Sequence, residues 1–301
     1  MLNFLLILFC IGAGFFLRRS KILPVDGYKS LNIWVIYIGL PAIAFKYLPH
    51  LIWTSTLWVA IAVPILLFVG SAIFFKILAY FFAWSRRTTH SLILIAGLSN
   101  TSFIGFPLVA SYFGDSQLKW AIISDQTTFF LLATVGVWVA LNGTGRQAMP
   151  ATFFVKRILT FPPLLGFLAA LILPRFMDLS PMEPFFHSLA ATVSPIALFS
   201  VGMQLSFNFY KAERLAIFTA LSYKLILGPT TLILLFHFLD LDSEIVRIAT
   251  FEMAMPCLVS TSLILQEFKL NSKLGNAIIG LSIFVGLLTT YGAYWLINVL
   301  L

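Results

Sequence analysis

The hydrophobic positions of this chain are gathered into apolar runs of about 17–25 residues, the length that a helix needs to cross a bilayer. Short stretches rich in charged, polar, Gly and Pro residues separate these runs. The pattern predicts an all-α polytopic membrane protein with ten transmembrane helices. The predicted spans cover residues 1–17, 30–48, 55–82, 89–113, 117–141, 158–174, 185–206, 213–238, 244–266 and 273–299.

The composition excludes a soluble globular protein. Hydrophobic residues make up 60% of the 301 residues and charged residues only 10%, whereas soluble domains carry about 25% charged residues. The first apolar run is followed, and not preceded, by Arg18, Arg19 and Lys21, so it is predicted to be a retained span rather than a secretory signal. Cys10 and Cys257 lie in separate apolar runs and form no metal-binding cluster, which indicates packing roles.

The basic residues are divided unevenly between alternate loops. Cytoplasmic loops are enriched in Lys and Arg, so the richer side is predicted to be cytoplasmic, and both termini to lie on the non-cytoplasmic side of the cell membrane. This orientation accounts for the net charge of +8 without nucleic acid as a partner. The richer side holds Arg18, Arg19, Lys21, Lys29, Arg86, Arg87, Arg146, Lys156, Arg157, Lys211, Arg214, Lys269 and Lys273, and the poorer side holds Lys46, Lys119, Arg175 and Arg247.

The chain repeats itself at a nearly constant offset. LPAIAF at 40–45 recurs as SPIALF at 194–199, an offset of 154, and AII at Ala121 recurs 156 residues later. Each unit, residues 1–145 and 146–301, holds five predicted spans, so the second unit starts on the opposite side of the membrane from the first. The sequence therefore predicts an inverted repeat, the architecture of many secondary transporters.

Spans four and nine carry helix-breaking and polar residues in matching positions of the two units. Span four contains GLSNTSFIGFP and span nine contains FEMAMPCLVSTS. Proline removes a helix hydrogen bond, and unwound backbone inside a membrane must face a cavity or another protein segment. We predict that both spans break, cross near the midplane and form the substrate site, whereas Pro64 and Pro229 in spans three and eight serve helix packing. The predicted substrate-binding residues are Ser99, Asn100, Thr101, Ser102, Gly105, Pro107, Pro256, Cys257, Ser260 and Thr261.

Ionisable residues inside spans form a second set of candidates, because charge in the bilayer is costly. Glu252 and Asp125 have short side chains, so a carboxylate there is expected to bind Na⁺ or exchange a proton, unless Glu252 is a structural partner of Arg247 or a lysine. Lys76 and Lys224 are long enough to snorkel to an interface, with a buried lysine that balances a carboxylate as the alternative. The ion-coupling candidates are Glu252, Asp125, Thr128 and Met255, with Na⁺ at Glu252 as the only metal considered and no other cofactor expected.

These motifs resemble the auxin efflux carrier family. SNTSFIGFPL at 99–108 is similar to that family's span-four signature, in which Asn-Thr precedes Gly-x-Pro, while LNIWVIYIGLPAIAF resembles its second span and FEMAMP its ninth. The resemblance covers essentially the whole chain. It implies two inverted five-helix repeats, a scaffold domain, and a transport domain whose spans four and nine cross, as in the bile acid sodium symporters. It also implies that Asn100 contacts the substrate and that Pro107 is the crossover proline.

The chain departs from the patterns of both families in span nine. Plant carriers have a second proline where this chain has Thr261. FEMAMPC also resembles a stretch of the bile acid symporters whose Glu, matching Glu252, takes part in sodium binding. The Gln and Asn of that stretch are replaced here by Pro256 and Cys257, so the resemblance does not carry a complete sodium site.

The expected function is secondary transport of a small organic anion, such as a dicarboxylate or an auxin-like weak acid, by elevator-like motion. A sensor with a transporter-like fold is the alternative, followed by an intramembrane enzyme. The chain is not expected to be an enzyme, because it has no His-Glu-x-x-His or Gly-x-Gly-Asp motif, and it lacks the phosphate loop of an ATP-driven pump. The expected partners are the anion and the lipid bilayer, and a homodimer is left open beside a monomer.

Overall fold

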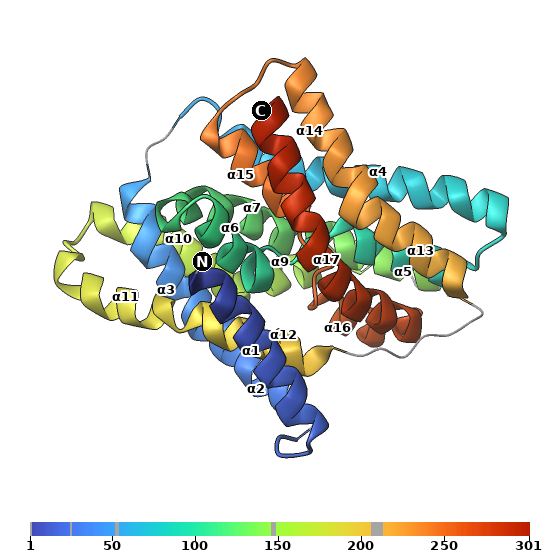
Figure 1. Ribbon diagram of the computed structural model, residues 1–301, viewed down its shortest axis with the longest axis horizontal. Coiled ribbons are helices and arrows are strands. Elements are labelled where there is room, and N and C mark those ends of the chain that lie inside the picture. The colour runs from blue at the N-terminus through green and yellow to red at the C-terminus, as the bar shows by residue number, and fades with distance from the viewer. Residues whose placement is uncertain (1, 25, 52–53, 146–148, 206–212) are drawn as a thin grey trace.

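The computed structural model describes residues 2–24, 26–51, 54–145, 149–205 and 213–301, and Figure 1 shows this part of the chain as an assembly of helices. Within these ranges no strand is formed, apart from one isolated β-bridge. Arg146 and Lys211, two of the basic residues used to predict the orientation, lie outside the described residues.

The helices of the first half follow the predicted apolar runs closely. They are α1 (Leu2–Arg19), α2 (Gly27–Trp34), η1 (Val35–Gly39), α3 (Leu40–Tyr47), η2 (Leu48–His50), α4 (Trp58–Phe82), α5 (Arg86–Gly97), η3 (Thr101–Gly105), α6 (Phe106–Tyr112), η4 (Asp115–Gln117), α7 (Leu118–Leu131), η5 (Leu132–Gly136) and α8 (Val137–Thr144). Ser85 begins α5 as its N-cap, because its hydroxyl accepts a hydrogen bond from the Thr88 N–H.

The helices of the second half follow the predicted runs in the same way. They are α9 (Ala151–Leu159), α10 (Pro162–Ile172), η6 (Leu173–Arg175), η7 (Ser180–Met182), α11 (Glu183–Ala191), α12 (Val193–Gln204), α13 (Arg214–Ser222), η9 (Tyr223–Leu227), α14 (Gly228–Phe238), α15 (Glu244–Met253), α16 (Thr261–Glu267) and α17 (Ser272–Leu300). Four of the short elements, η1, η3, η5 and η9, are single π-helical turns, a conformation that is frequent at functional sites.

Six helical runs in the described residues are long and apolar enough to cross a membrane, and the bent pair α9–α10 makes as many as seven. The three other predicted spans are α1 and the interrupted segments α5–α6 and α15–α16, so ten spans and an inverted repeat stay a prediction. The pair α9–α10 is bent by 65°, so the predicted span 158–174 corresponds to α10 and η6, and α9 precedes it as a separate helix. Phe161 is extended there (φ −87°, ψ 109°) because it precedes Pro162, which disfavours the helical conformation of the residue before it.

The helices pack in two groups that meet around η3–α6. The first, here called the α1–α12 group, comprises α1, α2, α3, α10, α11 and α12, and the second, the α4–α17 group, comprises α4, α5, α7, α8, α13, α14, α15 and α17. The segment η3–α6 contacts α1 and α12 on one side and α7 and α15 on the other, and Figure 1 shows α6 in the middle of the assembly. The first broken span therefore lies at the boundary between the groups.

Two glycines allow α1 and α12 to meet backbone to backbone. A Cβ atom on Gly14 would lie 2.1 Å from the carbonyl oxygen of Phe199, and one on Gly202 would lie 2.1 Å from that of Ile11. Small residues at such contacts are typical of helix pairs in membranes. Large apolar side chains such as Phe81 and Leu288 are exposed on the outside of the α4–α17 group, as expected of a surface that faces lipid.

Candidate functional site

The two broken spans contact each other through their main chains. Helix α5 ends at Gly97 and α15 ends at Met253. Just beyond these ends the Asn100 N–H donates to the Pro256 carbonyl (2.8 Å) and the Leu258 N–H donates to the Leu98 carbonyl (3.0 Å), which makes an antiparallel bridge between Ser99 and Cys257. We call residues 98–102 and 253–258, together with the side chains packed on them, the crossing. These bonds satisfy backbone groups that lipid would leave unpaired.

Asp125 holds the first break in place from helix α7. One oxygen of its carboxylate accepts hydrogen bonds from Thr101 Oγ1 (2.6 Å) and from Ser102 Oγ, and the other lies 3.4 Å from Gln126 Nε2. All four side chains are buried. Asp125 is thus a hydrogen-bond acceptor for the unwound segment. The hydroxyls of Thr101 and Ser102, which were predicted to bind the substrate, both donate to it.

Several polar atoms buried around the crossing have no hydrogen-bond partner in the part of the chain that the structure describes. Asn100 accepts from the Phe103 N–H through its Oδ1 atom (3.3 Å), while its Nδ2 atom is unpaired. The unpaired set also includes Gln126 Oε1, Thr261 Oγ1 and both carboxylate oxygens of Glu252. Buried polar atoms are paired in the great majority of cases, so the unpaired atoms make the crossing a candidate ligand site.

Glu252 packs directly against the first break. A Cβ atom added to Gly105 would lie 2.5 Å from Glu252 Oε1 and 3.3 Å from Met255 Cγ. Glycine is therefore needed at position 105 for the carboxylate to approach the π-turn η3. The alternative pairing of Glu252 with Arg247 is wrong, because Arg247 pairs with Asp242 (2.9 Å) and donates to the Leu301 carbonyl.

The other predicted residues divide between the crossing and its surroundings. The Cys257 N–H donates to Ser282 Oγ (3.0 Å), and Pro256 packs against the position of Gly286. Thr128 is buried, and its hydroxyl donates to the Ser124 carbonyl within its own helix. Pro107 and Ser260 line cavities on different sides of the crossing.

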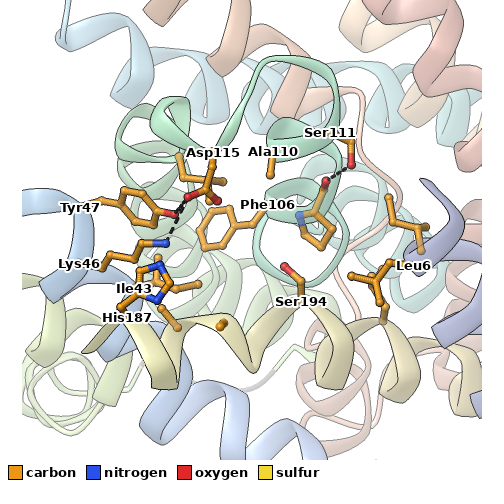
Figure 2. A pocket seen from close by; sticks show the side chains of 16 residues that line it. Leu6, Ile43, Lys46, Tyr47, Phe106, Ala110, Ser111, Asp115, His187 and Ser194 are labelled. Atoms are coloured by element: carbon orange, nitrogen blue, oxygen red, sulfur yellow. Dashed lines mark hydrogen bonds and ion pairs between the residues drawn. The ribbon is translucent and has the colours of Figure 1, made fainter. Parts of the chain in front are cut away.

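The cavity next to α6, here called the α6 cavity, has a volume of 330 Å³. Its wall includes Leu6 of α1, Lys46 and Tyr47 of α3, Pro107 of α6 and Ser194 of α12. Figure 2 shows the side chains of Lys46 and Tyr47 turned toward Asp115 at one end of it. Lys46 Nζ lies 3.2 Å and Tyr47 OH 2.5 Å from Asp115 Oδ2.

A second cavity of 440 Å³, here called the α16 cavity, lies next to the other break. Tyr28 of α2, Gln204 of α12 and Ser260 are among its lining residues. Arg157, also on its wall, forms a two-point ion pair with Glu267 of α16, with both N···O distances at 3.1 Å. The two cavities share α12 and the α2–α3 run but use opposite ends of them, so they lie at opposite ends of the α1–α12 group.

Part of this arrangement was not predicted. Snorkelling to an interface was the first interpretation of Lys224 and burial beside a carboxylate the alternative; the side chain is fully buried at the crossing, where its Nζ donates to Ser99 Oγ (2.5 Å) and to the Met253 carbonyl (2.9 Å). Lys76 is exposed on α4. The ion pairs Lys46–Asp115 and Arg157–Glu267 join segments far apart in the chain, and no sequence motif predicted them. The repeat offset did contain a clue, because Ser99 and Met253, the two partners of Lys224, are 154 residues apart and therefore occupy matching positions in the two repeat units.

The described residues also bear on whether the protein holds a metal ion. In the part of the chain that the structure describes, no group of three or more His, Cys, Asp or Glu side chains is placed to hold a metal ion. A cation at Glu252 would therefore depend on that one carboxylate together with hydroxyl, amide and main-chain oxygens, the ligands that hard cations accept.

Comparison with known proteins agrees with the geometry. A family model described as membrane transport protein matches residues 1–294. An uncharacterized transporter of Methanocaldococcus jannaschii is 27% identical over 295 residues, covering 93% of this chain and 92% of the relative. Uncharacterized transporters of Methanothermobacter thermautotrophicus (92% of this chain, 91% of the relative) and of Escherichia coli K12 (90% and 88%) are each 23% identical. The chain belongs to this membrane transport protein family, the auxin efflux carrier-like group of transporters that its motifs resemble.

Proposed function

We propose that this protein is a secondary transporter that moves a small organic anion, such as a dicarboxylate or an auxin-like weak acid, across the cell membrane. The observation that carries the proposal is the crossing itself. Asn100 Nδ2, Thr261 Oγ1 and both Glu252 carboxylate oxygens are buried there or close by without hydrogen-bond partners, and one cavity lies beside α6 and another beside α16. A transporter needs such a site near the midplane with an approach from either side.

An anion is the solute that the donors of the crossing favour. The Asn100 amide offers an unpaired N–H group, and the segment η3–α6, residues 101–112, begins at the crossing with the positive end of its helix dipole. A carboxylate of the solute would accept from Asn100, as the resemblance to auxin carriers implies for the matching Asn.

Movement of the α4–α17 group past the α1–α12 group would expose the crossing to each cavity in turn. Each cavity is bordered by an ion pair that ties the end of a broken span to another element, Lys46–Asp115 at one end and Arg157–Glu267 at the other. These residues are partly exposed, and exposed ion pairs contribute only about 0–1 kcal/mol. Such pairs can close a cavity and still open at little cost, which suits the elevator motion and the ten-span inverted repeat that we propose.

Coupling to a cation is proposed at Glu252. Its carboxylate is fully buried and both oxygens are unpaired, and a buried carboxylate without a partner is costly unless it carries a proton or a metal ion. Either H⁺ or Na⁺ would meet this need, and Asp125 lies near enough to interact with Glu252 electrostatically. The uneven loop charges support an orientation with both termini on the non-cytoplasmic side, which is part of this proposal.

Uptake into proteoliposomes tests the proposed function. Purified protein is reconstituted, and uptake of radiolabelled dicarboxylates and indole acids is followed with and without a Na⁺ or H⁺ gradient, with protein-free vesicles as the control. Saturable uptake of an organic anion supports transport. Saturable binding without uptake would instead identify a sensor, and neither binding nor uptake of any organic anion would overturn the assignment of the solute class.

A further inference from the structure

Lys224 is a buried cation for which the proposed transport cycle has no assigned place. Among the residues whose side chains the structure describes, it is the only Lys or Arg that is buried. It lines neither the α6 cavity nor the α16 cavity. Its charge is therefore directed at the protein itself, and the question is what an ammonium group does behind the crossing.

The backbone around Lys224 fixes the direction of its side chain. Lys224 lies in the π-helical turn η9, between α13 and α14. The neighbouring Tyr223 anchors this turn to α4, because its hydroxyl donates to the Leu67 carbonyl (2.8 Å). With the turn held in place, the lysine stem extends into the α4–α17 group instead of reaching an interface.

The ammonium group meets the ends of both broken spans. It donates to Ser99 Oγ of the first break and to the carbonyl of Met253, the last residue of α15. The carbonyls of a helix C-terminus lack partners within the helix and form its negative end. Lys224 thus satisfies one such carbonyl and joins the two breaks with a single charge.

Besides the Cys257 thiol, the ionisable groups that face Lys224 are carboxyl groups. Glu252 interacts with it electrostatically, and Asp125 interacts in turn with Glu252. All three side chains are fully buried. With one ammonium group beside two carboxyl groups, neutrality requires one further proton or cation, and the two unpaired oxygens of Glu252 offer a place for it.

We propose that Lys224 is the resident cation of the crossing, a positioning residue whose ammonium group occupies the place of an inorganic cation between Ser99 and Met253. The crossing then assembles without Na⁺ at this point, and Glu252 alone is left for an exchangeable cation. Removing the ammonium group opens a place lined by a hydroxyl, a carbonyl and a nearby carboxylate, the oxygen ligands that Na⁺ accepts. Lys224 holds this place whether or not the protein carries a solute, so the test measures stability and not flux.

Thermal unfolding of the purified full-length protein tests this role. Wild type, Lys224→Met, Lys224→Arg and Lys76→Met are compared in 150 mM NaCl and in 150 mM N-methyl-D-glucamine chloride. Without Na⁺, Lys224→Met is expected to unfold about 5–10 °C below wild type, because a buried ion network loses its cation. Na⁺ should raise the unfolding temperature of Lys224→Met more than that of wild type. Lys224→Arg, which keeps the charge, and Lys76→Met, which changes an exposed lysine, should respond to Na⁺ as wild type does.

Equal responses of wild type and Lys224→Met to Na⁺ would overturn the proposal, and so would an unchanged unfolding temperature of Lys224→Met without Na⁺. Should Lys224→Met fail to fold in both salts, Lys224→Gln decides, since it keeps an N–H donor and removes the charge. Lys224→Gln that is less stable than wild type without Na⁺ and regains stability with it supports a resident cation. Lys224→Gln that matches wild type without Na⁺ shows that no charge is needed there.

Discussion

Asn100 and Pro256 come from opposite halves of the chain, and the N–H of Asn100 donates to the carbonyl of Pro256 over 2.8 Å. This bond occupies the main chain of Asn100 and leaves its side-chain Nδ2 atom unpaired in a buried position. Two helices that stop inside a membrane thereby supply each other's missing hydrogen bonds, and the side chains around them become available for a solute and a cation. The predictions below test separate parts of this arrangement.

The carboxylate of Asp125 is expected to stabilise the first break through its bond with Ser102. In a double-mutant cycle on the free energy of unfolding, Ser102→Ala and Asp125→Asn should show a coupling of about 1–3 kcal/mol, the range for a buried hydrogen bond to a charged group. Thr250→Ala is the control for Ser102→Ala, because Thr250 is buried and bonds only the Val246 carbonyl of its own helix. Strict additivity of Ser102→Ala and Asp125→Asn would show that the bond does not stabilise the protein.

Gly105 is expected to be the glycine on which the position of Glu252 depends. Gly105→Ala places a methyl group 2.5 Å from Glu252 Oε1, so the carboxylate must move, and the unfolding free energy should fall by about 1–3 kcal/mol. Gly292→Ala, with nothing within 4 Å of the added Cβ, should leave stability unchanged or raise it slightly. Thermal unfolding of both variants checks this, and equal effects at the two positions would argue against close packing of Glu252.

Glu252 is expected to set the cation dependence of transport. Glu252→Gln removes the charge and keeps the size of the side chain, so a proton or Na⁺ gradient should no longer accelerate uptake into proteoliposomes. Downhill exchange of labelled for unlabelled solute should persist, because Asn100 is intact. Glu244→Gln, at the exposed start of the same helix α15, is the matched control. If Glu252→Gln responds to both gradients as wild type does, the residue is structural.

The two peripheral ion pairs are expected to act as separate closures. In variants with a single reporter, Ser194→Cys in the α6 cavity or Ser262→Cys in the α16 cavity, the rate of alkylation by a membrane-impermeant reagent is measured. Native Cys10 and Cys257 are buried. Asp115→Asn should raise the rate at position 194 about fivefold, since a pair of about 1 kcal/mol is lost, and Glu267→Gln should do so at position 262.

Asp242→Asn serves as the control for the closures, because Asp242 pairs with Arg247 away from both cavities. It should leave both alkylation rates unchanged. A response at both reporters to either Asp115→Asn or Glu267→Gln would show general loosening of the protein and not the opening of one cavity.

The sequence was sufficient to predict the helices and the meeting of the two breaks. Pro256 lies in the break that follows α15, whereas the break that follows α5 falls at residues 98–100, so Pro107 lies inside α6 and not at the crossover that the resemblance implied. The 154-residue offset relates Ser99 to Met253, which the structure brings into contact. These features follow from local chemistry, since proline, glycine and clustered small polar residues act on the backbone where they stand. The number of spans and their inverted relationship stay predictions.

Contacts between distant side chains could not be predicted in the same way. Lys224 and Lys76 look alike in the sequence, each a lysine inside an apolar run. What separates them is the anchoring of Tyr223 on α4 and the presence of an unpaired helix end within reach, which depend on packing. Thr128 shows the reverse case. Its position close to Asp125 in the sequence suggested a role at the site, but its hydroxyl donates to the Ser124 carbonyl of its own helix.

Equilibrium binding of a labelled organic anion to the purified protein tests most directly whether the crossing is the solute site. The titration compares wild type with Asn100→Ala and with the buried control Thr250→Ala, after thermal unfolding has confirmed that all three are folded. We predict saturable binding to wild type and Thr250→Ala, and at least about tenfold weaker binding to Asn100→Ala, the effect of losing one hydrogen bond to a charged group. Equal affinity of Asn100→Ala and wild type would contradict the account and place the solute elsewhere.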